Sequence, residues 1–160
     1  MSAADARGSL VLSQRLAQSA FALVQWRLAP RGEAAAQFPA NARSAYLGAT
    51  RTFPAMLQFN GPAVALEMLG RKSGGTDAAK ALGNDLYALI RRIETRDEPF
   101  ERWRDTFCAA APSKHLETLR NFARNADVDA YVLLHHRIAL AATWLKHYAE
   151  LVCPDAEKRP

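Results

Sequence analysis

Apolar residues recur every three or four positions along most of the chain, which is the spacing of amphipathic α-helices. The clearest stripe lies near the C-terminus and consists of Tyr131, Leu134, Ile138, Ala141, Leu145, Tyr148 and Val152. Four more residues widen its apolar arc: Leu133, Leu140, Trp144 and Leu151. A helix with so wide an arc should pack centrally against several others. Asp129 is its predicted N-cap, and Pro154 marks its end.

The N-terminal third predicts two helices. The first should begin at Ser9, a suitable N-cap, and end before Pro30. Its expected inner stripe is Leu10, Gln14, Ala17, Phe21, Val24 and Leu28. The second should open at Pro39 and kink or restart at Pro54, because proline removes an internal hydrogen bond of the helix.

Glycine and proline mark the later breaks. Asn60-Gly61-Pro62 predicts the end of one helix and the start of a short third helix. The segment Gly70 to Gly75 predicts a loop, and a fourth helix should follow from Thr76-Asp77. In that helix Gly83 should either bend the backbone or lie against a neighbour. Two further short helices are expected to begin at Asp97 and Pro112.

No segment alternates apolar and polar residues as a half-buried strand does, and leucine and alanine outnumber the β-branched residues. The sequence therefore predicts an all-α, single-domain bundle of six or seven helices with a long central C-terminal helix. The expected domain covers residues 9–153. A flexible lead, 1–8, precedes it, and a charged tail, 154–160, follows it.

Positive charge is concentrated near the N-terminus. The chain has a net charge of +5, and residues 1–60 hold six arginines against two acidic residues. Arg43 and Arg51 share one side of the second predicted helix, and Arg15 lies on the first. Lys72 lies in the glycine-rich loop. Arginine matches phosphate geometry, so such residues can follow a nucleic-acid backbone without reading bases. Alternatively, these basic residues belong to helix faces and a turn that contact only solvent.

No catalytic constellation is evident. The glycine-rich loop lacks the spacing of a phosphate-binding loop, and His135-His136 should point about 100° apart on a helix. Cys108 and Cys153 lie among small or apolar residues and suit a reducing cytoplasm. We therefore expect no catalytic site, no metal, no cofactor, no small-molecule substrate and no membrane segment. The three tryptophans should lie in the core rather than stack on bases. They are Trp26, Trp103 and Trp144.

Three segments in order resemble the Cmr-type small subunit of type III-B CRISPR complexes. They are Phe53-Pro54-Ala55-Met56-Leu57 through Gly61 to Leu66, then Ala78 to Leu86, then Tyr131-x-x-Leu134 with Ala141 to Glu150. The resemblance implies a helical, non-enzymatic, cytoplasmic protein. It also implies that copies of the chain line up beside the subunits that carry the guide RNA and help hold target RNA through its backbone. Lys80 and Lys146 fall in these segments and join the arginines as candidate RNA-binding residues.

Two hypotheses follow. In the first, the chain grips RNA electrostatically through Arg15, Arg43, Arg51, Lys72, Lys80 and Lys146. In the second, it is a purely structural scaffold or adaptor that contacts only protein, with Leu47 and Trp26 buried at subunit contacts. A distant third is an enzyme that acts through Cys108 or a histidine.

Overall fold

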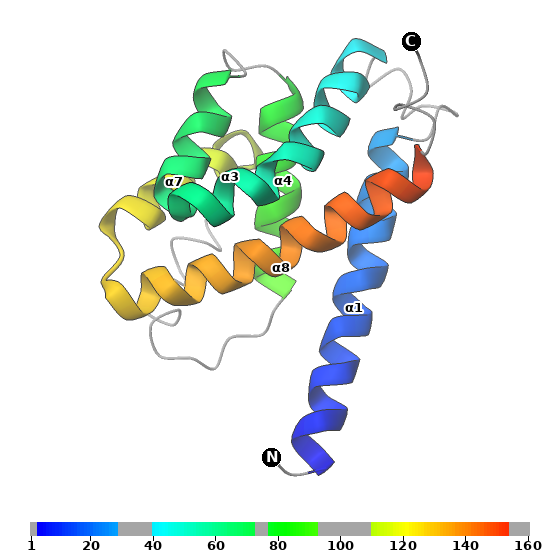
Figure 1. Cartoon of the computed structure of the whole chain (residues 1–160), viewed down its shortest axis with the longest axis vertical. Helices are drawn as coiled ribbons and strands as arrows, with labels where there is room; N and C mark the ends of the chain where they lie inside the picture. Colours follow the sequence, from blue (N-terminus) through cyan, green and yellow to red (C-terminus); the bar gives the residue numbers. More distant parts are fainter. Residues whose placement is uncertain (1–2, 29–39, 73–76, 93–109, 154–160) are drawn as a thin grey trace.

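The computed structural model describes residues 3–28, 40–72, 77–92 and 110–153 (Figure 1). These residues form five α-helices and one short 3₁₀ turn, with no strand among them. In chain order the elements are α1 (Ala3–Leu28), α3 (Ala40–Lys72), α4 (Asp77–Arg92), η1 (Pro112–Lys114), α7 (His115–Asn125) and α8 (Val128–Val152). The all-α prediction is confirmed, but six or seven helices is too many for this part of the chain. The short helix predicted from Asp97 lies outside the described residues.

Helix α8 is the central element, as the width of its apolar arc predicted. It packs against α1, α3 and α4 and crosses in front of α1 in Figure 1. Leu134, Ile138 and Leu145 are fully buried in the core. The predicted cap at Asp129 is wrong. Asp127 has extended backbone and its carboxylate accepts a hydrogen bond from the Ala130 amide at 2.9 Å, so it caps the helix instead.

Helix α3 consists of two arms that meet at Gly61, as Figure 1 shows. Gly61 has φ 73° and ψ 170°, whereas helical hydrogen bonding resumes on both sides of it. A side chain there would be strained, and its Cβ would also lie 2.8 Å from the Tyr131 hydroxyl. The predicted break at Gly61 is therefore confirmed. The predicted restart at Pro54 is wrong, because helical dihedrals continue through that residue. The residues from Gly70 to Lys72, expected in a loop, belong to the second arm.

Helix α1 begins at Ala3, ahead of the predicted cap at Ser9. Its buried stripe is also rotated relative to the prediction. The inner residues are Leu16, Ala20, Val24 and Leu28, and Gln14 and Phe21 are exposed. Arg27 explains the rotation: it lies three residues after Val24, so it shares the inner face, and its guanidinium turns inward to a buried carboxylate of α4.

Gly83 allows α4 and α7 to approach closely. A Cβ added there would lie 2.7 Å from the Leu116 Cβ and 3.2 Å from the Leu116 Cα. The second distance involves backbone, so a rotamer change cannot relieve the contact. Of the two roles expected for Gly83, the structure shows the second: it lies against a neighbouring helix.

Gly83→Ala should therefore destabilise the protein by about 1–3 kcal/mol, because the added methyl group forces α4 and α7 apart. Urea unfolding followed by circular dichroism measures the change.

Gly48→Ala is the matched control. Gly48 is also a helical glycine, but an added Cβ meets nothing within 4 Å. This variant should be more stable by about 0.5–1 kcal/mol, since alanine favours the helix. Equal effects of the two substitutions would contradict the close approach at Gly83.

Candidate nucleic-acid interface

Three predicted arginines lie on α1 and on the first arm of α3. Arg15 is exposed on α1, whereas Arg43 and Arg51 are half-buried on α3. None of the three forms an ion pair within the described part of the chain. The Nε atom of Arg51 is buried and has no hydrogen-bond partner there. That atom is shielded from solvent, so any contact of Arg51 with an external anion has to be made by the rest of its guanidinium group.

Acidic residues are absent from the same two stretches. The described side chains of α1, from Ser13 to Leu28, and the first arm of α3, from Ala40 to Asn60, contain no aspartate or glutamate. The two elements contact each other. The carboxylate that the structure places between them, Asp85 of α4, pairs with Arg27 and leaves Arg15, Arg43 and Arg51 without an ion pair among the described residues. A surface of this kind attracts phosphate.

The predicted lysines are not gathered at this surface. Lys80 is exposed near the start of α4. Lys146 forms an ion pair with Glu150, Nζ to Oε1 3.9 Å, one turn along α8. The backbone of Lys72 ends α3, and its side chain lies outside the described structure. The structure thus brings the arginines of α1 and α3 onto neighbouring elements and leaves the lysines apart.

A buried ion pair joins α1, α3 and α4. The Asp85 carboxylate on α4 is 1% exposed. Arg27 donates to both of its oxygens, from Nε at 3.2 Å and from a terminal nitrogen at 3.0 Å. The Tyr46 hydroxyl donates to the same carboxylate at 2.7 Å, and Thr50 donates to the Tyr46 carbonyl oxygen. Arg27 is therefore occupied inside the protein and does not add to the arginine surface.

Burial raises the pKa of Asp85, although the hydrogen bonds from Arg27 and Tyr46 partly oppose that rise. Burial also raises the pKa of Tyr46 well above its usual value, and the neighbouring Asp85 charge raises it further. Ionised Asp85 therefore costs folding free energy. This cost grows as the pH rises from the ordinary pKa of an aspartate toward the raised folded-state pKa.

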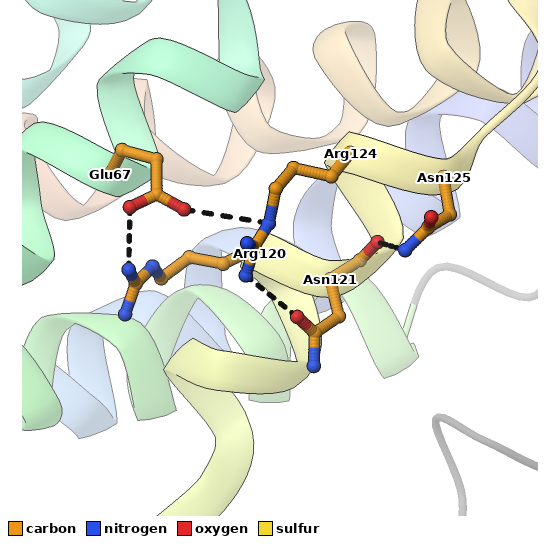
Figure 2. Close-up of polar contacts among 5 residues, drawn as sticks. All are labelled: Glu67, Arg120, Asn121, Arg124 and Asn125. Atoms are coloured by element: carbon orange, nitrogen blue, oxygen red, sulfur yellow. Dashed lines mark hydrogen bonds and ion pairs between the residues drawn. The ribbon is translucent and has the colours of Figure 1, made fainter.

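A second ion pair joins the second arm of α3 to α7 (Figure 2). Arg120 donates to one oxygen of Glu67, and the Arg124 Nε lies 3.5 Å from the other oxygen. The Arg120 guanidinium also passes over Gly70, where an added Cβ would lie 3.3 Å from it. The hydrogen bond from Arg120 lowers the pKa of Glu67, despite partial burial of its carboxylate. Arg120 and Arg124 are thus both paired with Glu67 inside the protein.

The nucleophile and metal candidates do not come together. No three metal-ligating side chains cluster among the residues that the structure describes. Cys153 is a free, half-buried cysteine just after α8, and Cys108 lies outside the description. His115 stacks on Tyr87 with ring centroids 3.9 Å apart, and its Nε2 lies 3.2 Å from the Ala110 carbonyl oxygen. Burial lowers the pKa of His115, and the nearby Arg91 charge lowers it further.

Residues 12–152 match the family model described as "CRISPR-associated protein (Cas_Cmr5)". This match covers most of the chain. The chain belongs to the Cmr5 family. The resemblance to the Cmr-type small subunit is thereby confirmed.

The solved structures agree with this assignment. A CRISPR-associated Cmr5 family protein from Thermus thermophilus is 25% identical, with a TM-score of 0.58. The alignment covers 88% of this chain and 96% of that one. No curated protein sequence matches the chain significantly. Among the described helices, none has the length and apolar character needed to cross a membrane.

Sequence reasoning missed two features of this Cmr5 protein. Trp26, expected in the core, is 43% exposed and lies against its neighbour Arg27. Phe21, expected on the inner stripe, is exposed beside Tyr148. The rotated setting of α1 explains Phe21. Trp26 lies two residues from both Val24 and Leu28, so it points away from the buried stripe in either setting. The ion pair of Lys146, in contrast, could have been predicted from the sequence. Glu150 follows Lys146 at the i,i+4 spacing at which helical residues form ion pairs.

Asp85→Asn should destabilise this Cmr5 protein by about 3–5 kcal/mol, because it leaves the largely buried Arg27 without its counter-charge. Arg27→Gln should cost a comparable amount. The double variant should lose much less than the sum of the two, since neither charge then remains unpaired. Chemical denaturation of the four proteins measures this coupling, and simple additivity would contradict the pair.

Glu67→Gln should remove a pH-dependent part of the stability. Because the folded-state pKa of Glu67 lies below its usual value of 4.5, its contribution is complete above pH 4.5. It is lost as the pH falls through the lowered value. The wild-type protein should therefore be more stable than the variant at neutral pH, and the two should converge in acid. Urea unfolding at a series of pH values measures the difference.

Glu150→Gln provides the comparison, since the Lys146–Glu150 pair is largely exposed. An exposed i,i+4 pair contributes only about 0.3–0.5 kcal/mol, so this variant should change little at any pH. A larger pH-dependent effect from Glu150 than from Glu67 would contradict the role assigned to the α3–α7 pair.

Proposed function

We propose that this Cmr5 protein is the non-catalytic small subunit of a cytoplasmic type III-B CRISPR effector complex. It packs beside the subunits that carry the guide RNA, with further copies of itself. It helps hold target RNA through contacts with the backbone that do not depend on sequence. Membership of the Cmr5 family, over residues 12–152, is the observation that carries this proposal.

The distribution of ion pairs supports RNA contact through α1 and the first arm of α3. Arg27, Arg120 and Arg124 all have carboxylate partners inside the protein. Arg15, Arg43 and Arg51 have none among the described residues. Cations without an internal partner are the ones available to an external polyanion, and phosphate is the anion that arginine fits best. Lys72, Lys80 and Lys146 remain candidates of lower rank, because no described feature links them to this surface.

The pattern of perturbed pKa values supports a non-catalytic role. Active sites concentrate shifted groups in an accessible cleft. Here Asp85, Tyr46 and Glu67 are engaged in contacts between helices. His115 lines a hollow of about 290 Å³, but its ring stacks on Tyr87 and its Nε2 lies against the Ala110 carbonyl oxygen. Each shift therefore has a structural cause.

A scaffold that contacts only protein is the second candidate. Large apolar side chains on the surface favour it, among them Trp26, Phe59, Leu140 and Leu151. Trp26 remains available for a subunit contact, as this hypothesis requires. Leu47 does not, since it is only 8% exposed and belongs to the core. The earlier expectation for Leu47 is therefore wrong: the first arm of α3 turns it toward the core of the protein itself.

The double variant Arg43→Glu, Arg51→Glu should abolish binding of single-stranded RNA at low salt. Two phosphate contacts are lost and two repulsive charges are added. Each phosphate contact also contributes about 0.7 to the slope of log affinity against log salt concentration. Arg15→Glu alone should weaken binding and reduce that slope. Fluorescence anisotropy with a labelled oligonucleotide measures both, and circular dichroism checks that helicity is retained.

Lys114→Glu is the matched control for Arg15→Glu. Lys114 is an exposed cation on η1, which packs against α7, and the change in net charge is the same. It should leave affinity almost unchanged. Equal losses from both variants would show that only net charge matters. If the Arg43→Glu, Arg51→Glu variant keeps its RNA affinity and still assembles into the complex, the result would favour the scaffold.

A further inference from the structure

A hollow of about 510 Å³ lies between α1 and α8. Its lining residues are Gln14, Ala17, Gln18 and Phe21 of α1 and Tyr148 of α8. Phe21 is 39% exposed, and its ring centroid lies 5.2 Å from that of Tyr148 at an interplanar angle of 59°. The lining of the hollow therefore combines exposed aromatic surface with two glutamines. The functions considered above do not use it.

The Tyr148 ring packs against two neighbouring aromatic rings of α8. Trp144 stacks on it at a centroid distance of 5.7 Å and an angle of 16°. His147 meets the edges of both rings, at 6.1 Å from Trp144 and 5.2 Å from Tyr148. A ring fixed in this way loses little conformational freedom when a ligand stacks on it.

The charges around the hollow suit a polyanion. Its α1 wall belongs to the stretch from Ser13 to Leu28, whose described side chains include no acidic residue. Exposed Arg15 follows Gln14 on the same helix but does not line the hollow. On α8, Glu150 follows Tyr148 by two residues, so it points to nearly the opposite side of the helix, where Lys146 pairs with it. Negative charge is thus kept away from the aromatic surface.

We propose that a base of single-stranded RNA stacks in this hollow against Phe21 and Tyr148, with the amides of Gln14 and Gln18 at its polar edge. Stacking on aromatic side chains tolerates any base, because every base has a π-face. Each glutamine amide both donates and accepts hydrogen bonds, so it also selects no single base. The glutamine amides can hydrogen-bond the polar edge of a base, and an α1 wall without acidic side chains suits the attached phosphates.

This inference rests on the proposed RNA-binding function and adds a second kind of contact to it. The arginines hold the backbone, and the hollow holds a base. The two contributions separate experimentally, because only the first depends on salt through the release of counterions.

The test compares two probes on the full chain: a labelled oligouridine, and an abasic ribose-phosphate chain of the same length. Both carry the same phosphates, so their salt slopes should be equal. The oligouridine should bind about 5- to 150-fold more tightly, the range expected for stacking one base. Phe21→Leu should remove this difference, since it keeps an apolar side chain but loses the ring, and Phe21→Tyr should restore it.

Phe59→Leu is the matched control, because Phe59 is 83% exposed on α3 and does not line the hollow. It should keep the full difference between the probes. Circular dichroism and the recovery with Phe21→Tyr distinguish loss of stacking from loss of folding.

Equal affinity for the two probes in the wild-type protein, with a clear salt slope, would end the base-stacking inference and leave the proposed function intact. Binding of neither probe at low salt would overturn both. A Phe21→Leu variant that keeps the preference for oligouridine but no longer co-elutes with the complex would assign the hollow to a protein partner instead.

Discussion

The buried carboxylate of Asp85 determines how three helices meet. It lies on α4, receives two hydrogen bonds from Arg27 of α1 and accepts a third from Tyr46 of α3. A carboxylate buried without partners would be too costly to keep ionised, so all three helices must hold their positions together. Because Arg27 occupies the inner face of α1, this contact also fixes the rotation of that helix. The residues Gln14, Gln18 and Phe21 then face outward.

Ion pairing also shapes the surface. The described carboxylates of Asp85, Glu67 and Glu150 each pair with a basic residue of the chain itself. Arg15, Arg43 and Arg51 lack such partners among the described residues. These three arginines therefore lie on two helices that contact each other and have no ion pair in the described structure. Internal ion pairs hold the helices, and what remains outside them is a surface suited to phosphate.

The helical stripe of α8 and the break at Gly61 could be predicted from sequence, because each depends on local spacing or on one glycine. The rotation of α1 could not. It depends on Arg27, a polar residue outside the predicted apolar stripe, whose partner Asp85 lies 58 positions away. For the same reason, the candidate site could be predicted only as a set of basic residues. Which arginines are available to RNA depends on pairs such as Glu67 with Arg120, which are 53 positions apart.

The rotated setting of α1 links the stability of the bundle to its proposed role. If Arg27 faced solvent, the stripe of Gln14, Ala17 and Phe21 would be turned toward the core, and the aromatic hollow beside Tyr148 would not exist. The ion pair at Asp85 is buried and belongs to no exposed surface, yet it sets which side of α1 faces solvent. A variant that weakens this pair would therefore alter both the fold and the exposed aromatic surface, whereas a change at Phe21 alters the surface alone.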